Sequence, residues 1–123
     1  MQQYKITLDE SIISDFLSYI GLSESKEVEL KLETDGGEHT AQITIGSNIS
    51  HQFNLTISPN NIESLKKKSK DVSLLINGEF LAKIFSAIDF NKENKPVLYI
   101  ANEKPIVVIE DNTLWSIAPM IGE

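Results

Sequence analysis

The sequence contains neither cysteine nor arginine, and these absences exclude several kinds of functional site. Without cysteine, the chain cannot form a disulfide, offer a thiolate ligand to a metal or use a cysteine nucleophile. All eleven of its cationic side chains are lysine, so the bidentate guanidinium group that reads phosphates and guanine edges is missing. We therefore expect no sequence-specific recognition of DNA.

Long apolar runs are absent as well. No segment approaches the ~20 apolar residues that a helix needs to cross a bilayer, and the start, MQQYKITLDE, lacks the charged and apolar regions of an export signal. We therefore expect a cytoplasmic protein with no membrane partner. The 123 residues, with 41% hydrophobic residues and a formal net charge of −7, match one globular domain of ordinary size.

Catalytic and cofactor-binding motifs are missing too. The only imidazoles, those of His39 and His51, stand on strand-like segments beside no convincing carboxylate pair, and we expect both to be solvated. Residues 35–37, Asp-Gly-Gly, lack the lysine and helix start that follow a phosphate-binding loop. Trp115 could stack on a base or sugar, but its spacing from Ile117 favours packing. The sequence predicts no catalytic residue, metal ligand or cofactor.

What the sequence does contain is an internal repeat. In YKITLDESIISDFLSYIG, a strand of alternating apolar residues runs into a helix, and DVSLLINGEFLAKIFSAID repeats that pattern 68 residues later. The apolar stripe of the first helix consists of Ile12, Ile13, Phe16, Leu17 and Ile20. The matching stripe of the second helix consists of Phe80, Leu81, Ile84, Phe85 and Ile88.

Both helices have residues that favour their ends. Asp9 and Asn77 stand where an N-cap side chain accepts from the free amides of the first turn, and Gly21 can take the left-handed conformation that ends a helix. Three further strands follow in each half. They are separated by turn segments such as residues 35–37 and residues 111–112, Asp-Asn, and each half closes on Ile-x-Pro.

These patterns predict an α+β fold made of two βαβββ units, about residues 1–59 and 71–121. A polar, lysine-rich crossover of about residues 60–70 joins them. Each helix must bury its apolar stripe, so we expect the two helices to pack on one face of antiparallel sheets.

The doubled unit resembles one domain of the DNA sliding clamps, the processivity rings of replication. The likeness is most specific in VSLLINGEFLAKIFSAIDFNKENKPVLYIANEKPIVVIEDNTLWSIAPMI, which is similar to the C-terminal domain of the bacterial DNA polymerase III β clamp. Eukaryotic and archaeal clamps end similarly, on Leu-Ala-Pro-Lys-Ile. The resemblance implies a DNA clamp fold in which six domains form a ring, with helices lining the hole and no bond made or broken.

A clamp surrounds duplex DNA through sequence-independent attraction between inward-facing cations and phosphates. The faces opposite the two apolar helix stripes are poor in cations, since only Lys83 stands among residues such as Asp15 and Glu79. The densest positive stretch is in the crossover. Two interpretations of this stretch are open: its lysines contact phosphates, or they belong to a solvated loop with no binding role. The candidate DNA-facing residues are Ser11, Ser14, Ser18, Lys66, Lys67, Lys68, Lys70 and Lys83.

The resemblance also implies a pocket for short segments of polymerases and other clamp-binding proteins, lined by the C-terminal strand and tail. Carried over by position, the partner-binding residues are Ile117, Ala118, Pro119, Met120 and Ile121. A tail that stays apolar after its proline suits a docking rim, with methionine supplying adaptable contacts. The alternative is that this tail folds back onto its own sheet.

Three functions stay open at this point. The first is a non-enzymatic processivity component that assembles with itself or with related domains around DNA and recruits replication proteins. The second is a clamp-like interaction module that does not encircle DNA. The third is a small-ligand or thioesterase-type enzyme, which would need an acid and a base in a helix-lined cleft.

Overall fold

The computed structural model describes residues 2–67, 70–91 and 95–120. In chain order, its elements are β1 (Tyr4–Thr7), α1 (Glu10–Leu22), β2 (Glu27–Asp35), β3 (Glu38–Ile45), β4 (Phe53–Ile57), the 3₁₀ turn η1 (Pro59–Asn61), β5 (Ile62–Ser64), β6 (Val72–Asn77), α2 (Gly78–Ser86), β7 (Val97–Ile100), β8 (Ile106–Glu110) and β9 (Thr113–Ile117). No helix in these described ranges is long and apolar enough to span a membrane.

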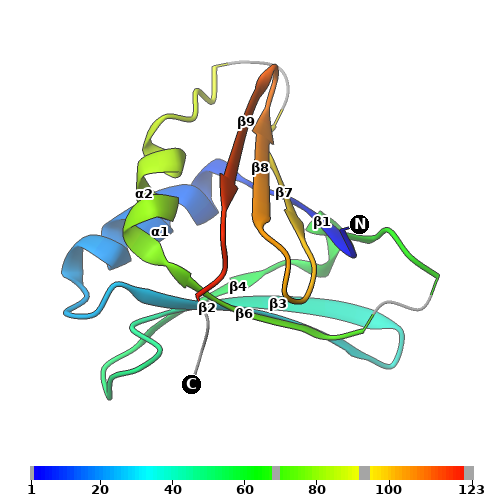
Figure 1. Ribbon diagram of the computed structural model, residues 1–123, viewed down its shortest axis with the longest axis horizontal. Coiled ribbons are helices and arrows are strands. Elements are labelled where there is room, and N and C mark those ends of the chain that lie inside the picture. The colour runs from blue at the N-terminus through cyan, green and yellow to red at the C-terminus, as the bar shows by residue number, and fades with distance from the viewer. Residues whose placement is uncertain (1, 68–69, 92–94, 121–123) are drawn as a thin grey trace.

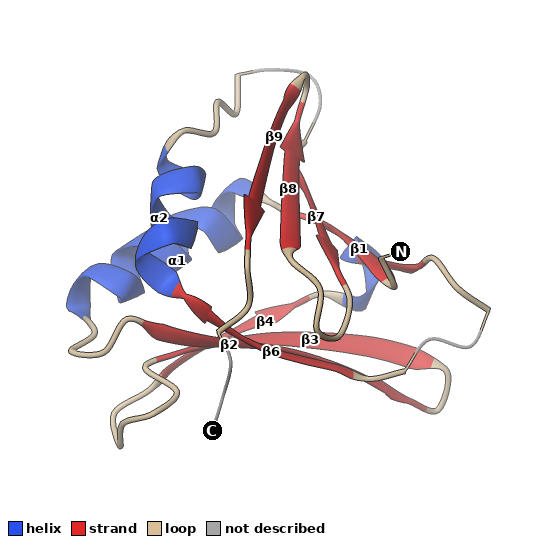
Figure 2. Cartoon of the chain, viewed as in Figure 1, coloured by secondary structure: helices blue, strands red, loops and turns tan. Residues whose placement is uncertain are grey.

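Two antiparallel sheets and two helices make up the fold (Figure 1). Sheet A has the strand order β5-β1-β7-β8-β9, and sheet B has the order β4-β3-β2-β6. In the view of Figure 2, sheet B lies flat, strands β7 to β9 stand upright above it, and both helices lie on the same side of those strands. The predicted α+β architecture is therefore confirmed, with the helices side by side.

The predicted internal repeat is also present. The order β1-α1-β2-β3-β4 recurs as β6-α2-β7-β8-β9, and the helices of the two units contact each other through a T-shaped ring pair, Phe16 and Phe85, at 5.2 Å. The apolar side chains of each strand's inward face are buried, from Tyr4 and Ile6 in β1 to Ile117 in β9. Burial of these alternating faces and helix stripes is the main stabilising contribution.

The crossover differs from the plain polar linker that the sequence predicts. It contains η1 and the short strand β5, which pairs with β1 in the register Ile6 with Ile62. The sequence pattern did not predict β5 because this strand spans only three residues and has a single buried apolar side chain, that of Ile62. The lysine-rich part comes after this strand, and Lys68 lies outside the described residues.

Tight turns join the strands of the hairpins as predicted. Gly36 and Gly37 have φ angles of +60° and +84°, the left-handed conformations that a two-residue hairpin loop requires and that glycine adopts without strain. In the second unit, Glu103 in the matching β7–β8 turn and Asp111 in the β8–β9 turn are left-handed, with φ angles of +60° and +50°. Aspartate tolerates this region better than most residues because its short side chain can bond locally.

Of the three predicted helix ends, Asn77 is correct, Asp9 stands at the predicted position without the predicted hydrogen bond, and Gly21 is wrong. Asn77 caps α2, since its Oδ1 accepts from the amides of Glu79 and Phe80 at 2.9 and 3.4 Å. Asp9 occupies the N-cap position of α1 but makes no capping hydrogen bond. Gly21 lies inside α1, which ends at Leu22 and is followed by the C-cap residue Ser23 with an ordinary φ of −75°.

Asp9 is drawn away from the helix by two partners. Its carboxylate accepts from Asn61 Nδ2 at 2.7 Å and from Lys95 Nζ at 3.0 Å. These two hydrogen bonds favour the ionised form and hold the pKa of Asp9 below its usual value. Asp9 therefore ties η1 and the start of β7 to the start of α1.

Two of the edge strands are both open and long enough to accept a further strand. In the described part of the chain, β4 and β9 each have one side that pairs with no strand. The outer edge of β6 is partly covered, because the amide of Ser73 donates to Asn102 Oδ1 and the carbonyl of Leu75 accepts from the amide of Met120. Edge strand β5 is very short, so β4 and β9 are the edges best suited to accept a further strand.

Candidate protein-docking site

The C-terminal tail leaves sheet A and crosses to sheet B. β9 ends at the buried Ile117, Pro119 follows two residues later, and the amide of Met120 donates to the carbonyl of Leu75 in β6 at 2.7 Å. Proline ends the strand because it has no amide for a further ladder bond. Ile121, the last predicted docking residue, lies outside the described residues.

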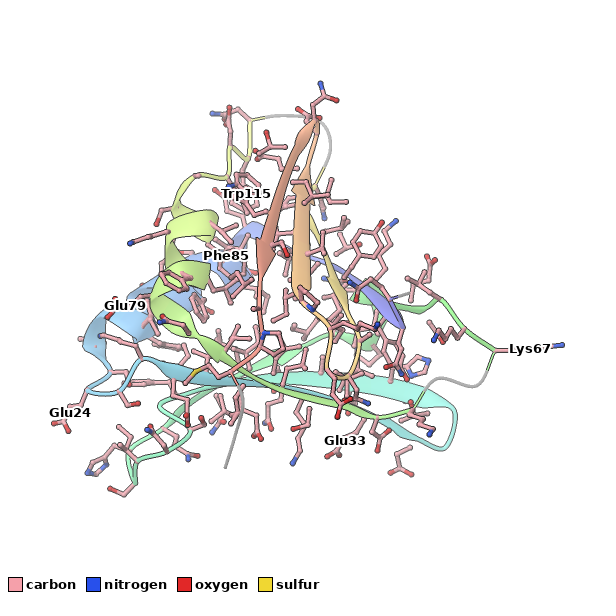
Figure 3. All side chains as sticks on the ribbon, in the orientation of Figure 1. Glu24, Glu33, Lys67, Glu79, Phe85 and Trp115 are labelled. Carbon is pink, nitrogen blue, oxygen red and sulfur yellow. The ribbon has the colours of Figure 1, made fainter. Side chains whose placement is uncertain are left out.

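A groove opens on one side of this tail, between α2 and β9. We call it the α2–β9 groove; its volume is about 560 Å³. Phe80 and Ile84 of α2 form one wall, Trp115 and Ile117 of β9 form the other, and Met120 closes one end. Figure 3 shows Trp115 on β9 facing the helix that carries Phe85. The groove therefore presents apolar side chains from two segments far apart in sequence.

Phe80 is the residue that the sequence pattern placed wrongly. It was expected in the buried stripe of α2, but it is 53% exposed and lines the groove. Its position at the edge of a wide stripe explains the difference, because Leu81, Ile84 and Phe85 already fill the helix face against the core. An aromatic side chain this exposed beside a half-buried tryptophan makes the groove a surface suited to protein contact.

Lys83 adds the single positive charge of the α2–β9 groove. Its ammonium lies 5.8 Å from the centroid of the Phe80 ring, within the range of a cation–π contact. This contact holds the lysine beside the apolar wall while the charged group stays in water. The groove therefore combines an apolar floor with a cation at its rim.

A second groove lies on the other side of the tail. We call it the β6–tail groove; its volume is about 540 Å³, and Leu75, Pro119 and Met120 supply its apolar part. Its carboxylates are those of Glu29 and Glu103. Met120, which is 45% exposed, is a wall of both grooves. The sequence identified the tail but not Leu75, Phe80 or Glu103, which only the tertiary structure brings beside it.

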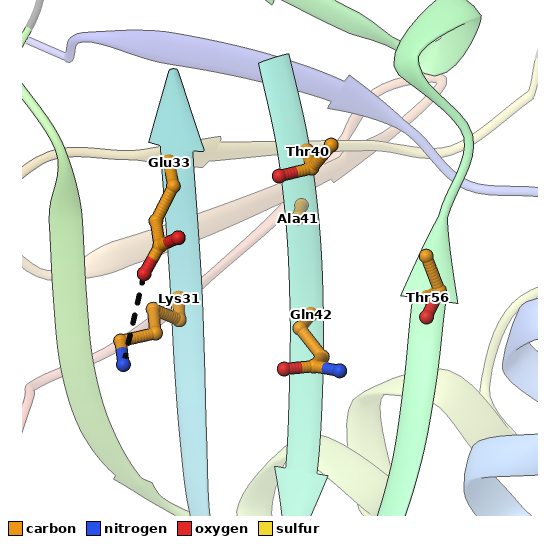
Figure 4. Close-up of a pocket in the computed structure, with 6 residues that line it drawn as sticks. All are labelled: Lys31, Glu33, Thr40, Ala41, Gln42 and Thr56. Atoms are coloured by element: carbon orange, nitrogen blue, oxygen red, sulfur yellow. Dashed lines mark ion pairs between the residues drawn. The ribbon is translucent and has the colours of Figure 1, made fainter. Parts of the chain in front are cut away.

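A third depression lies on the outer face of sheet B (Figure 4) and is much smaller, about 190 Å³. It is lined mainly by polar strand side chains such as Thr40, Gln42 and Thr56, with an ion pair between Lys31 Nζ and Glu33 Oε1 at 3.7 Å. Both ionic side chains are about half exposed, and such pairs contribute little stability. This face lacks an apolar anchor point and is a solvated sheet surface.

The predicted DNA-facing residues do not lie together. Ser11, Ser14 and Ser18 are exposed on α1, and Lys83 is exposed on α2. Lys67 of the crossover is elsewhere, since Figure 3 places it at the opposite end of the molecule from the two helices. A duplex running along the helices would therefore meet the serines and Lys83 but not the crossover.

The exposed surface of the two helices carries more negative than positive charge. Glu10, Asp15 and Glu79 face solvent with Lys83 as the only cation, which gives a net charge of −3 + 1 = −2. Phosphate groups would be repelled by such a surface at low salt.

The two histidines show no catalytic arrangement. His39 Nδ1 lies 2.8 Å from Thr34 Oγ1, and its ring packs edge-on against Tyr4 at 5.3 Å. His51 is exposed in the loop before β4. Within the described ranges, no group of three or more histidine, aspartate or glutamate side chains is placed to hold a metal ion. Trp115 packs against the core as predicted, and it also lines the groove.

Comparison with solved structures identifies the fold. A DNA polymerase III subunit β from Borrelia burgdorferi superimposes with a TM-score of 0.71 over 98% of this chain, at 16% identity. The β chain from Streptococcus pneumoniae gives 0.70 over 99% at 14% identity, and a putative β subunit from Eubacterium rectale gives 0.67 over 98% at 22% identity. This chain has the fold of one DNA sliding-clamp domain.

The clamp domain described here is short beside those structures. It spans only 31 to 32% of the length of the matched chains. No protein-family model matches the sequence, and no curated protein sequence matches it either. The clamp resemblance inferred from the sequence is thus confirmed at the level of the fold.

Proposed function

We propose that this protein is a non-enzymatic component of a DNA polymerase processivity clamp, working in the cytoplasm. The observation that carries the proposal is the superposition of nearly the whole chain on DNA polymerase III β subunits. The paired helices support it further, because in a sliding clamp such helices line the central hole. The protein acts by holding other proteins near DNA, without making or breaking a bond.

Assembly is part of the proposal, because one domain cannot surround a duplex. The chain is about a third as long as the chains it matches, so a ring needs further copies of it or related subunits. Support comes from the open edges of β4 and β9, which are five residues long each. A β9 edge of one domain pairing with a β4 edge of the next would continue the sheets across the boundary.

Partner recruitment is assigned to the tail residues Ile117, Ala118, Pro119 and Met120. Two grooves of more than 500 Å³ flank this tail, and Met120 lines both. Exposed methionine and an extended tail suit short apolar peptide segments, which gain affinity from a few anchor side chains. The partner class is a clamp-binding segment of a polymerase or another replication protein.

The second candidate function is a clamp-like interaction module that does not encircle DNA. The net charge of −2 on the exposed helix surfaces favours it, since a DNA-lining surface is expected to be basic. In that case the grooves beside the tail would bind proteins in the same way, but the helices would face solvent or another protein.

Light scattering separates the two functions. A ring predicts particles several times the mass of one chain, and addition of duplex DNA should not dissociate them. Monomers alone at high concentration, with and without DNA, would refute the ring and leave the interaction module.

The docking tail has its own test. Met120→Ala is expected to weaken binding of a polymerase-derived clamp-binding peptide by about tenfold, because it removes an apolar wall shared by two grooves. Leu65→Ala is the control, since Leu65 is also exposed but lies in the crossover. Fluorescence anisotropy measures both, and equal affinity of wild type and Met120→Ala would contradict the assignment.

A further inference from the structure

The β6–tail groove is built on the outer face of sheet B. Glu29 of β2 and Leu75 of β6 are opposite each other in the sheet register, and both side chains point away from the core because the next residue in each strand is buried. Leu75 is half-buried and supplies the apolar floor, and Pro119 and Met120 lie beside it. The groove therefore places a carboxylate directly next to an apolar surface.

The β7–β8 turn, residues 101–105, supplies a further part of this groove. Asn102 binds the turn to β6, because its Oδ1 accepts from the amide of Ser73 at 3.2 Å and its Nδ2 donates to the carbonyl of Asp71 at 2.7 Å. In Figure 1, this turn and the tail after β9 both run down to sheet B. The next residue, Glu103, is thereby held beside β6, where it lines the groove.

Glu103 adopts a backbone conformation that is unfavourable for a glutamate. Its φ angle is +60°, in the left-handed region that glycine adopts without strain. The side chain is exposed and forms no ion pair with any described residue, so it adds little to the stability of the turn. Residues held in such conformations cluster at functional sites. The carboxylate of Glu103 is therefore better explained by binding than by stability.

The β6–tail groove is acidic. Its charged side chains are those of Glu29 and Glu103, and no lysine lines it. Glu29 Oε2 accepts a long hydrogen bond of 3.5 Å from Ser73 Oγ, and neither carboxylate has an ion-pair partner in the described part of the chain. The α2–β9 groove carries the cation Lys83 instead. The two grooves on either side of Met120 thus have opposite charge and suit different ligands.

The edge of β6 offers a backbone donor beside the groove. The carbonyl of Leu75 accepts from the amide of Met120 on the outer edge of the strand. In an antiparallel strand, the amide and carbonyl of one residue face the same edge, so the Leu75 amide faces outward as well. Among the described residues it has no acceptor. An extended peptide segment along this edge would supply the missing carbonyl.

We propose that the β6–tail groove binds an extended segment of a partner protein that carries lysine or arginine. An apolar side chain of the segment rests on Leu75 and Pro119, its cation pairs with the carboxylates of Glu29 and Glu103, and one of its backbone carbonyls accepts from the Leu75 amide. The inference rests on the recruitment role proposed for the tail and adds a second ligand class to it. Lys83 would repel such a segment from the α2–β9 groove.

Fluorescence anisotropy with a labelled hexapeptide of alternating leucine and lysine tests the ligand class. The double variant Glu29→Gln/Glu103→Gln is expected to bind this basic peptide about three- to tenfold more weakly than wild type, which corresponds to the loss of two exposed ion pairs. Glu24→Gln/Glu38→Gln is the matched control, because it changes the net charge equally at two exposed carboxylates outside the groove. Equal affinities of the two double variants would overturn the proposal.

The single variant Glu103→Gly separates binding from stability. Glycine adopts a φ of +60° without strain, so the midpoint of urea unfolding should equal or exceed that of wild type. Affinity for the basic peptide should nevertheless fall about two- to fivefold, because one carboxylate is lost. A variant that loses stability but keeps full affinity would show that Glu103 serves the turn and not the ligand.

The only tryptophan of the chain reports which groove is occupied. Trp115 lines the α2–β9 groove but not the β6–tail groove, so the unlabelled basic peptide should leave its emission unchanged. A shifted emission would place the peptide in the wrong groove. Absence of binding to wild type at millimolar concentrations would also overturn the proposal.

The same peptides distinguish this proposal from the proposed function. If a clamp-binding peptide requires Met120 while the basic peptide is insensitive to Glu29→Gln/Glu103→Gln, the basic-segment site is wrong and recruitment by the tail stands. If the basic peptide depends on Glu29 and Glu103 while no clamp-binding peptide binds, the β6–tail site stands and the recruitment of clamp-binding segments is wrong.

Discussion

Gly78, the first residue of α2, offers a direct test of how the second helix meets the sheet. A methyl group at this position would lie 2.6 Å from Val28 Cγ2, 2.7 Å from Ile20 Cδ1 and 2.7 Å from the backbone oxygen of Lys26. The two side-chain ends can shift, but the Lys26 carbonyl also accepts the Gly78 amide at 2.8 Å. Gly78→Ala therefore forces the start of α2 away from the chain segment before β2.

The size of the effect follows from two opposing contributions. Alanine favours a helix over glycine by about 1 kcal/mol, whereas overpacking of a filled site costs about 1–3 kcal/mol. Because one of the close contacts is with a backbone oxygen, the overpacking cost lies in the upper part of that range, about 2–3 kcal/mol, and we expect a net loss of about 1–2 kcal/mol in the free energy of unfolding. Without the close contacts, the same change would stabilise the protein.

Gly21→Ala is the matched control. Gly21 also lies in a helix, but apart from its chain neighbours and the backbone of its own helix no atom comes within 4 Å of its added methyl group. This variant should gain about 0.5–1 kcal/mol because only the helix preference remains. Urea unfolding followed by circular dichroism measures both. A Gly78→Ala protein as stable as wild type would show that the helix–sheet packing described here is incorrect.

Two further predictions concern the helix starts. Asn77→Ala should lower the free energy of unfolding by about 1 kcal/mol in urea titrations, because the amides of Glu79 and Phe80 lose their acceptor; an unchanged midpoint would mean that the cap contributes nothing. The pKa of Asp9 is lowered in the folded state, so its ionic contacts stabilise the protein above the unfolded-state pKa of about 3.9 and are lost as the pH falls through the folded-state value. Wild type should therefore lose more stability than Asp9→Asn between about pH 5 and pH 2, and parallel pH–stability curves for the two proteins would contradict this role.

Much of the fold could be predicted because its signals are local. The alternating faces of the strands, the two-glycine turn at Gly36 and Gly37 and the Asn77 cap each depend on a few neighbouring residues, and the repeat supplies the strand and helix patterns twice. The features that sequence reasoning missed depend on distant partners. Asp9 leaves the α1 amides because Asn61 and Lys95, far along the chain, come within hydrogen-bonding distance.

The candidate site likewise contains residues that local sequence patterns predicted and residues that only the tertiary structure brings together. The tail was found because Pro119 and Met120 follow a strand pattern with a proline stop. Phe80 was assigned to the core because its spacing fits the helix stripe, and only the tertiary packing shows that Leu81 and Phe85 occupy the space instead. Leu75 and Glu103 gave no signal at all, since neither is near the tail in sequence. A groove built from segments far apart in sequence has no local pattern that would predict it.

The partial cover on β6 has a practical consequence for the solubility of the chain. In the described part of the chain, the outer edge of β6 is covered by two hydrogen bonds, one to the side chain of Asn102 and one from the backbone amide of Met120. Each such bond contributes only about 0.5–1.5 kcal/mol to stability. If the tail moved away from β6, the backbone groups of that strand would be exposed and could pair with a strand of another chain, which leads to aggregation. Purification tags are therefore better placed before β1 than after the tail.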